Sequence, residues 1–255
     1  MNLAHYTPSI SMEEKQAEEI VQMQCEANHA MAGNNWKKET DKYLFYRAGF
    51  IEAVEAIDEF KYKWWKSEEP DFSSALAELI DVLHFAVSSQ IIEFGEETAI
   101  KMLVNLDKNK ADLMPVGVHN PKEYRHFGEI DFDKLCSVFT PIDLCEQFIV
   151  SSITKGRCDL LLLFTIFDRI GITGNEVHGQ YVGKNALNMF RNDYGQKTGK
   201  YVKDWGAGHD TYFLQKYIDI CIDQGVSVVF KDTYDYLELS YNTRVLGKGS
   251  EYLTT

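Results

Sequence analysis

The stretch from Ala75 to Phe94 constrains the fold of this chain more than any other. Apolar residues fall on nearly every side of a helix drawn over this stretch, and no Lys or Arg lies between Lys66 and Lys101. A helix that is apolar all round is normally buried inside a protein. The sequence therefore predicts a central helix, over residues 73–94, that other helices cover on several sides.

This apolar helix nevertheless carries two carboxylates, Glu78 and Asp81, three residues apart. Glu52 and Glu55 have the same spacing on the preceding predicted helix, residues 43–60, and the segment between the helices contains the breaker Pro70. Residues three apart share a helix face, so a hairpin of the two helices would bring the acidic pairs together. Taken alone, the first pair is more often a solvated acidic face.

Carboxylates within an apolar helix are costly unless they are paired or bind a metal ion. The sequence offers no cation near the second acidic pair, and hard divalent ions prefer oxygen ligands. The pattern therefore predicts a metal site, with Mg²⁺ as the first choice. The predicted ligands are Glu52, Glu55, Glu78 and Asp81.

The rest of the chain also has mainly helical patterning, which predicts an all-α fold with one domain over residues 1–255. Further helices are expected over residues 12–32, 96–104, 140–155, 158–170, 173–191 and 210–223. Thr140 with Asp143, and Thr173 with Glu176, have the spacing of helix capping boxes. Residues 105–133 are expected to form a long loop or mobile insertion, and residues 226–246, rich in Val, Phe, Tyr and Thr, a short hairpin.

Composition excludes several classes of protein. The net charge of -13 and the pI near 5.0 argue against a broad nucleic-acid-binding surface. The five cysteines are scattered and include no C-x-x-C pair, which is typical of free thiols in a reducing compartment. No signal peptide is expected, and the densest apolar run, Leu160 to Phe167, is too short to cross a bilayer. A soluble cytoplasmic protein without a membrane partner is therefore predicted.

A basic segment interrupts this acidic chain. Residues 184–203 contain five Lys or Arg residues and one acid, Asp193, and part of the segment is a glycine-rich loop over residues 195–208. Basic side chains and glycine-exposed backbone amides suit a triphosphate. Taken alone, the segment is equally well explained as a solvated loop or as a surface for an acidic partner. The candidate phosphate contacts are Lys184, Arg191, Lys197, Tyr201 and Lys203.

Amide and aromatic side chains supply candidates for recognition of a base. Gln24 and Asn28 lie one turn apart on the first predicted helix, and Asn188 lies in the basic segment. Amides carry both donors and acceptors, which match the edge of a base. Trp65 could stack on a base, although tryptophans near helix ends more often belong to a core or an interface. His84 is expected to be a core histidine or a partner of a carboxylate.

In this order, these motifs resemble those of the dimeric dUTPases, a family of all-α NTP pyrophosphatases related to phage dCTPase-dUTPases and MazG-type enzymes. The resemblance extends over about residues 20–211. Its motifs are E-x-x-E at 52–55, W-W-K at 64–66, E-x-x-D at 78–81, K-N-x-x-N-x-F-R at 184–191 and G-x-K-x-G-x-Y-x-K-x-W at 195–205. The chain departs from the family where His209-Asp210-Thr211 replaces Glu-Asp-Asn, and at Gln196, where Tyr is common.

The resemblance implies a helical bundle that hydrolyses dUTP to dUMP and pyrophosphate with Mg²⁺, keeping uracil out of DNA. It assigns the four carboxylates to metal binding and catalysis, with Glu52 orienting or deprotonating the water. It also implies a homodimer, which the two strongly apolar helices, residues 75–94 and 158–170, favour independently. Substrate contacts would come from Gln24, Asn28, Trp65, Lys184, Asn188, Arg191, Lys197, Tyr201 and Lys203.

Two alternatives remain at this point. A related enzyme would prefer dCTP or accept both pyrimidine nucleotides, since amide side chains can turn to suit either base, and dUDP is a further candidate substrate. A protein of another class would be a non-catalytic helical adaptor whose acidic groove binds a basic partner. The basic segment favours an enzyme, because such an adaptor has no need of it.

Overall fold

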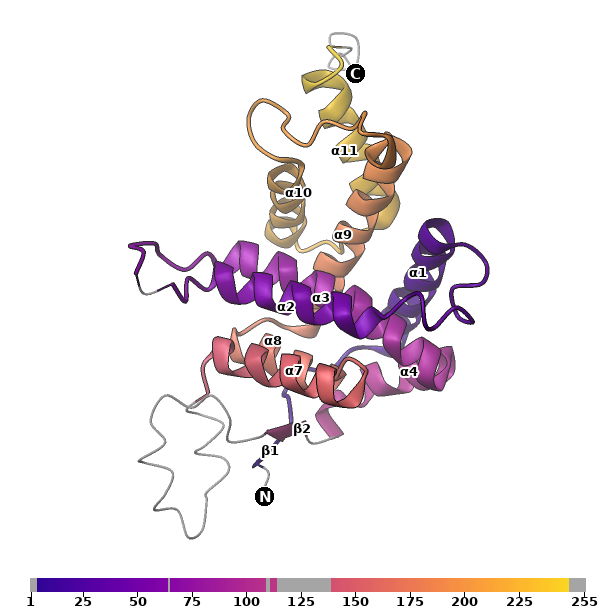
Figure 1. The fold of residues 1–255 in the computed structure, drawn as a ribbon. Coiled ribbons are helices and arrows are strands. Elements are labelled where there is room, and N and C mark those ends of the chain that lie inside the picture. The colour runs from indigo at the N-terminus through magenta and orange to yellow at the C-terminus, as the bar shows by residue number, and fades with distance from the viewer. Residues whose placement is uncertain (1–3, 64, 109–110, 114–138, 248–255) are drawn as a thin grey trace. The chain divides into compact units, whose positions relative to one another are not determined.

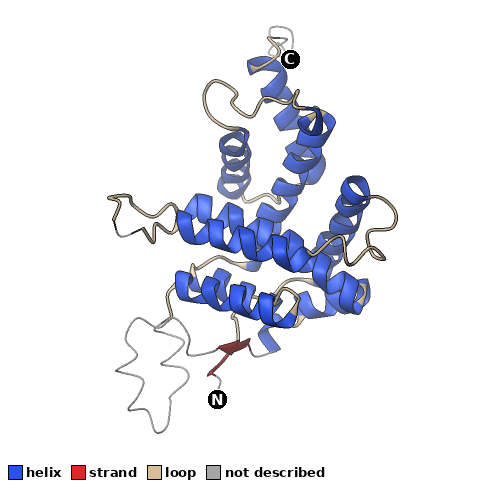
Figure 2. Cartoon of the chain, viewed as in Figure 1, coloured by secondary structure: helices blue, strands red, loops and turns tan. Residues whose placement is uncertain are grey.

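The computed structural model describes residues 4–63, 65–108, 111–113 and 139–247. The chain divides into two compact units, Met1–Val177 and His178–Thr255, and each unit is described by itself. Most described residues are helical, and the predicted all-α class is confirmed (Figures 1 and 2). The strands β1 (Ala4–Tyr6) and β2 (Ala111–Leu113) form a two-stranded antiparallel ribbon in which Ala4 pairs with Leu113.

The first unit is built around a helical hairpin. Its helices are α1 (Glu14–Ala32), α2 (Phe45–Glu59), α3 (Phe72–Phe94), α4 (Glu96–Val104), α7 (Pro141–Lys155), α8 (Leu160–Arg169) and the start of α9 (Gly174–Asp193). Helices α2 and α3 run side by side, joined by the segment 60–71 (Figure 1). Helices α1, α4 and α8 also contact α3, and α7 lies against α2.

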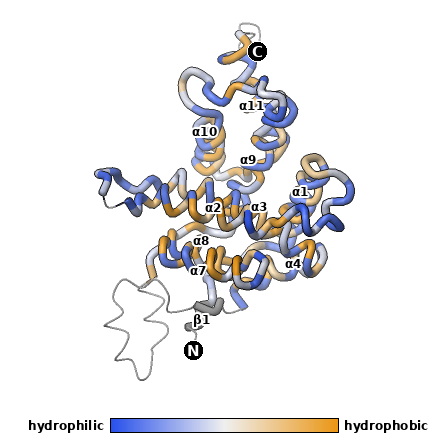
Figure 3. Tube along the Cα trace, viewed as in Figure 1, coloured by the Kyte–Doolittle hydropathy of each residue, from blue (hydrophilic) through white to orange (hydrophobic). Residues whose placement is uncertain are grey.

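Helix α3 is the central helix that the sequence predicts. Leu79, Ile80, Val82 and Leu83 are each at most 1% exposed, although they lie on different sides of the helix. The hydropathy along this helix can be followed in Figure 3. By length and composition α3 could also cross a membrane, and it is the one such helix in the described part of the chain. Because 72% of its apolar window is buried inside the protein, it has the character of a soluble protein's core helix.

Small residues let α2 approach its neighbours closely. Gly49, Ala53 and Ala56 make up the buried residues of this helix, and they repeat at the helical spacing. A Cβ atom on Gly49 would lie 2.7 Å from Sγ of Cys158 and 3.6 Å from Cβ of Phe85 on α3. This close packing sets how near the acidic side chains of α2 come to those of α3.

Two helix starts follow the capping rules directly. The Thr140 backbone N–H donates to Oδ2 of Asp143 over 2.7 Å, while Oγ1 of Thr140 accepts from the Asp143 N–H over 3.2 Å. Thr173 and Glu176 make the same reciprocal pair at the start of α9. Both predicted capping boxes are confirmed. They could be predicted because each bond joins residues only three apart.

The second unit contains most of α9, the 3₁₀ turn η2 (Gln196–Thr198), α10 (Asp210–Gln224) and α11 (Phe230–Arg244). Its core is an aromatic cluster centred on Phe190, whose ring centroid lies 4.2–6.0 Å from those of its neighbours. These neighbours are Tyr194, Tyr201, Trp205, Tyr234 and Tyr241.

The predicted hairpin over residues 226–246 is wrong, because most of this segment forms α11. Its buried residues, Thr233, Leu237 and Tyr241, recur every four residues and therefore lie on one helix face. The β-branched and aromatic residues suggested strands, but preference for strands depends on packing partners. In the described part of the predicted loop over residues 105–133, the regular elements are η1 (Leu106–Lys108) and β2. Residues 109–110 and 114–133 of this prediction lie outside the described residues.

Candidate active site

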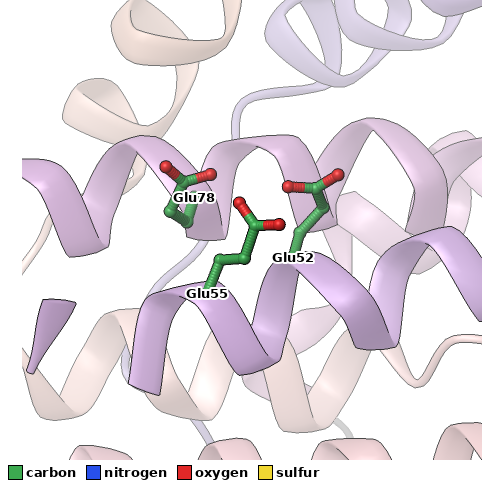
Figure 4. A group of neighbouring side chains, drawn as sticks. All are labelled: Glu52, Glu55 and Glu78. Carbon is green, nitrogen blue, oxygen red and sulfur yellow. The ribbon is translucent and has the colours of Figure 1, made fainter. Parts of the chain in front are cut away.

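Three of the four predicted metal ligands come together on the α2–α3 hairpin. Carboxylate oxygens of Glu52, Glu55 and Glu78 all lie within 4.8 Å of one another. Figure 4 shows the three side chains pointing toward one another from the two helices. Glu55 is exposed, whereas Glu52 and Glu78 are half-buried, so the group faces solvent on one side. We name these residues the carboxylate cluster.

The hairpin connection fixes the register of this cluster. Asp71 is the N-cap of α3 and accepts hydrogen bonds from the backbone N–H of Ser74 over 3.0 Å and from its hydroxyl over 2.8 Å. These bonds, led by the one from the backbone, lower the pKa of Asp71. The Asp71 N–H in turn donates to the Glu59 carbonyl at the end of α2, over 3.0 Å. These bonds tie the start of α3 to the end of α2. Glu55 and Glu52 lie about one and two helical turns before the end of α2, and Glu78 lies about two turns after the start of α3.

The carboxylate cluster has the donor chemistry of a divalent cation site. Two negative charges 4.8 Å apart repel by about 1 kcal/mol in water and by about 3–4 kcal/mol at an effective dielectric constant of 20. A hard cation with oxygen ligands would relieve that repulsion, and carboxylates are the side chains that Mg²⁺ prefers. The residues present therefore fit such an ion.

Asp81 does not belong to this group of three in the structure. Its Oδ1 lies 4.0 Å from Nδ1 of His84, one turn further along α3, and Nδ1 is itself 2.8 Å from the Ile80 carbonyl oxygen. The Asp81 side chain is 22% exposed, so the expectation of a buried carboxylate is wrong for this residue. Asp81 lies one turn from Glu78 along α3. A metal-binding role for Asp81 stays a prediction.

Two of the three predicted base-recognition amides, Gln24 and Asn28, belong to a buried network. Nε2 of Gln24 donates to Oδ1 of Asn28 over 3.1 Å, and Nδ2 of Asn28 donates to Oγ of Ser88 over 2.8 Å. The Ser88 hydroxyl donates to the His84 carbonyl over 2.8 Å. This network joins α1 to α3 within the unit that holds the carboxylate cluster. Trp65 is 60% exposed on the segment between α2 and α3.

In the second unit, two predicted phosphate contacts meet on a carboxylate that sequence reasoning did not single out. Arg191 donates from Nε and Nη2 to the two oxygens of Asp210, over 2.7 and 2.8 Å. The Tyr201 hydroxyl donates to Oδ2 of Asp210 over 2.8 Å. The Thr211 backbone N–H donates to Oδ1 over 2.8 Å. The sequence signal for Asp210 is its place in His209-Asp210-Thr211, where the resembling family also has Asp at the middle position.

Burial and neighbouring charges shift the pKa values of both Asp210 and Tyr201. Burial alone would raise the pKa of Asp210, but the hydrogen bonds and positive charge of Arg191, with the Tyr201 hydroxyl, outweigh it and lower the pKa. Burial, followed by the negative charge of Asp210, raises the pKa of Tyr201 well above its ordinary value. Asp210 is therefore ionised and Tyr201 protonated throughout the neutral range.

The other predicted contacts of the basic segment differ in exposure. Lys184 is buried, Asn188 is half-buried, and Lys197 and Lys203 are exposed on the loop. Beside Lys184, the buried Nδ2 of Asn185 has no hydrogen-bond partner among the described residues. A buried amide without a partner is a candidate for ligand contact. Sequence reasoning placed Asn185 in a motif but gave it no role.

Comparison with known proteins places these observations in a family. A family model described as dUTPase matches residues 16–195. That range contains the carboxylate cluster, Asp81, the Gln24–Asn28 pair and Arg191, and it ends before Lys197, Tyr201 and Lys203. The roles of all these residues stay predictions. A search of curated proteins gives no match. Since the family model matches well over half of the chain, the protein belongs to the dUTPase family of the all-α NTP pyrophosphatase type and is a nucleotide pyrophosphatase.

Proposed function

We propose that this protein hydrolyses dUTP to dUMP and pyrophosphate with the help of Mg²⁺. The observation that carries the proposal is the carboxylate cluster, in which three carboxylates from two adjacent helices lie within 4.8 Å. Membership of the dUTPase family supplies the class of substrate. The acidic composition and the family together favour a soluble cytoplasmic enzyme that keeps uracil out of DNA.

Glu52, Glu55 and Glu78, with Asp81 one turn away, would hold the metal. Bound there, Mg²⁺ would offset negative charge on the triphosphate and lower the pKa of a bound water. Glu52 is half-buried on α2 and would orient the attacking water and accept its proton. One P–O bond forms to the water oxygen, and the bridging P–O bond between the α and β phosphates breaks.

The remaining predicted contacts divide between the two ends of the nucleotide. The guanidinium of Arg191 and the lysines at 184, 197 and 203 would hold the phosphates, with the Tyr201 hydroxyl beside them. Charge-assisted hydrogen bonds of this kind are about twice as strong as neutral ones. Gln24, Asn28, Asn188 and the exposed ring of Trp65 would contact the base and the sugar.

A substrate panel tests the reaction. Pyrophosphate release is measured for dUTP, dCTP, dTTP, dATP, dGTP and UTP, and phosphate release for dUDP, each with Mg²⁺ or with EDTA. We expect kcat/KM to be highest for dUTP by at least about tenfold, the discrimination that a misplaced polar contact produces, and EDTA to abolish turnover. Equal rates with dCTP would favour the broader pyrimidine enzyme. No release from any nucleotide would overturn the proposal in favour of the adaptor.

We also propose that the protein is a homodimer. Four apolar side chains on α2 and α7, two helices that pack against each other, remain 37–56% exposed, and exposed apolar residues that form one patch mark an interaction surface. They are Ile51, Val54, Val150 and Ile153. Sedimentation at micromolar concentration should give twice the 29.3 kDa chain mass. A species of single-chain mass that retains full activity would contradict this proposal.

A further inference from the structure

We propose that Asp210 is a positioning residue, which fixes the direction of Arg191 and, by holding the Tyr201 hydroxyl, the loop that follows α9, for binding of the triphosphate. This inference rests on the proposed function and names a residue that acts through two others. Asp210 is 1% exposed and accepts four hydrogen bonds of 2.7–2.8 Å. A carboxylate has about four acceptor sites, so those of Asp210 are filled within the protein.

The pair with Arg191 sets the plane of the guanidinium. Nε and Nη2 each give one N–H to Asp210, and the Arg191 side chain is 12% exposed. A guanidinium has five N–H donors in a rigid planar fork, so a bidentate pair on one edge leaves three donors directed away from that edge. Asp210 thus decides where those three donors point, which a single hydrogen bond could not do.

The same carboxylate also fixes the loop that carries the exposed lysines. The Tyr201 ring stacks on Tyr241, with centroids 5.5 Å apart and planes 12° apart, while its hydroxyl is held by Asp210. The backbone N–H of Asp210 donates to the Lys203 carbonyl over 2.9 Å. Side chain and backbone of one residue therefore connect the end of α9, the loop and the start of α10.

An ion pair buried this deeply is a weak source of stability, since desolvation offsets much of the attraction. Removing one partner, however, leaves the other charge uncompensated. A positional role explains why one acceptor holds both the Arg191 guanidinium, which keeps further N–H donors, and the Tyr201 hydroxyl, whose single O–H is given to Asp210. A purely structural role predicts a loss of melting temperature with unchanged ligand affinity in the protein that remains folded.

The test compares Asp210→Asn and Tyr201→Phe with two matched controls in the same unit. Asp193→Asn removes a carboxylate that accepts from the Tyr234 hydroxyl over 2.8 Å, and Tyr194→Phe removes a hydroxyl that donates to Glu238 over 2.8 Å. Calorimetry measures the affinity of each full-length variant for inorganic tripolyphosphate and for deoxyuridine. Turnover of dUTP gives KM and kcat for the same proteins, and circular dichroism gives their melting temperatures.

We expect the Kd for tripolyphosphate to rise at least tenfold in Asp210→Asn and at least threefold in Tyr201→Phe. The Kd for deoxyuridine should stay within twofold, and both controls should resemble the wild type. Adding Arg191→Gln to Asp210→Asn should weaken tripolyphosphate binding little further, since contacting residues are not additive. If Asp210→Asn does not fold, Tyr201→Phe decides the question, because its ring and stacking remain.

Unchanged tripolyphosphate affinity in the folded variants, or an equal loss for deoxyuridine, would overturn the inference. So would a wild-type protein that does not bind tripolyphosphate. The proposed function would fail, independently of the inference about Asp210, if the wild type bound tripolyphosphate but released no pyrophosphate from dUTP. In that case the affinity measurements still decide whether Asp210 positions the two donors.

Discussion

Glu78→Gln is expected to lower kcat for pyrophosphate release from dUTP by about three orders of magnitude. The substitution keeps the size of the side chain but removes one of the three charges within 4.8 Å. Charge stabilisation by a bound metal contributes several kcal/mol to a transition state, and 1.36 kcal/mol corresponds to a tenfold rate. Removal of one of three ligand charges should therefore abolish most of the activity.

The thermal stability of the same variant should not fall together with its activity. Removing a charge relieves repulsion in the carboxylate cluster, so without metal the melting temperature should be unchanged or higher than that of the wild type. Mg²⁺ should raise the melting temperature of the wild type, because binding to the native state alone stabilises it. Mg²⁺ should raise that of Glu78→Gln much less, or not at all.

Glu93→Gln is the matched control for this experiment. Glu93 lies on the same helix as Glu78, but its carboxylate pairs with Arg157 over 2.8 Å, and both side chains are partly exposed. Its loss should alter neither kcat nor the effect of Mg²⁺. Asp81→Asn, measured beside them, decides whether the fourth predicted carboxylate shares the role of the cluster. Wild-type activity in Glu78→Gln would refute the metal assignment for this residue.

Gly49→Ala is expected to destabilise the protein by about 1–3 kcal/mol, the usual cost of overpacking a core. The added Cβ would lie 2.7 Å from Sγ of Cys158, so α2, the Cys158 side chain or the backbone that carries it must move. Because Glu52 lies one turn further along α2, a displaced helix should also separate it from Glu78 and lower kcat. Urea denaturation and dUTP turnover below the melting temperature measure the two effects.

A second substitution tests whether the contact with Cys158 causes the losses expected for Gly49→Ala. Cys158→Ala removes the atom that the new methyl group would meet, and Phe85 at 3.6 Å already permits ordinary contact. The double variant should therefore lie close to Cys158→Ala alone in both stability and activity, as expected for residues that share one contact. Simple addition of the two losses would show that Gly49 is required for another reason.

Several parts of the fold could be predicted because their causes are local. The capping boxes at Thr140 and Thr173 involve hydrogen bonds between residues three apart, so the sequence specifies both partners at once. The central position of α3 follows from its own apolar surface. The hairpin brings together Glu52, Glu55 and Glu78 because spacing and a short connection already constrain them.

Other parts depend on residues that are distant in sequence. Asp81 shares the spacing of Glu78, but it is not one of the three carboxylates that all lie within 4.8 Å of one another, and its Oδ1 lies 4.0 Å from Nδ1 of His84. The segment of α11 has strand-like composition, and its burial pattern became visible only in the folded unit. Sequence patterns report the periodicity of a single element, whereas these outcomes depend on which neighbours that element meets.

By itself, the sequence determined the all-α class, the two capped helix starts at Thr140 and Thr173, the acidic pairs and the resemblance to the dUTPases, since each depends on neighbouring residues or on motif spacing. Only the tertiary structure decided that Gly49 meets Cys158, that Gln24 and Asn28 reach Ser88, and that Arg191 and Tyr201 share Asp210. These contacts arise when helices pack, and the direction of a side chain at a contact depends on the whole set of elements around it.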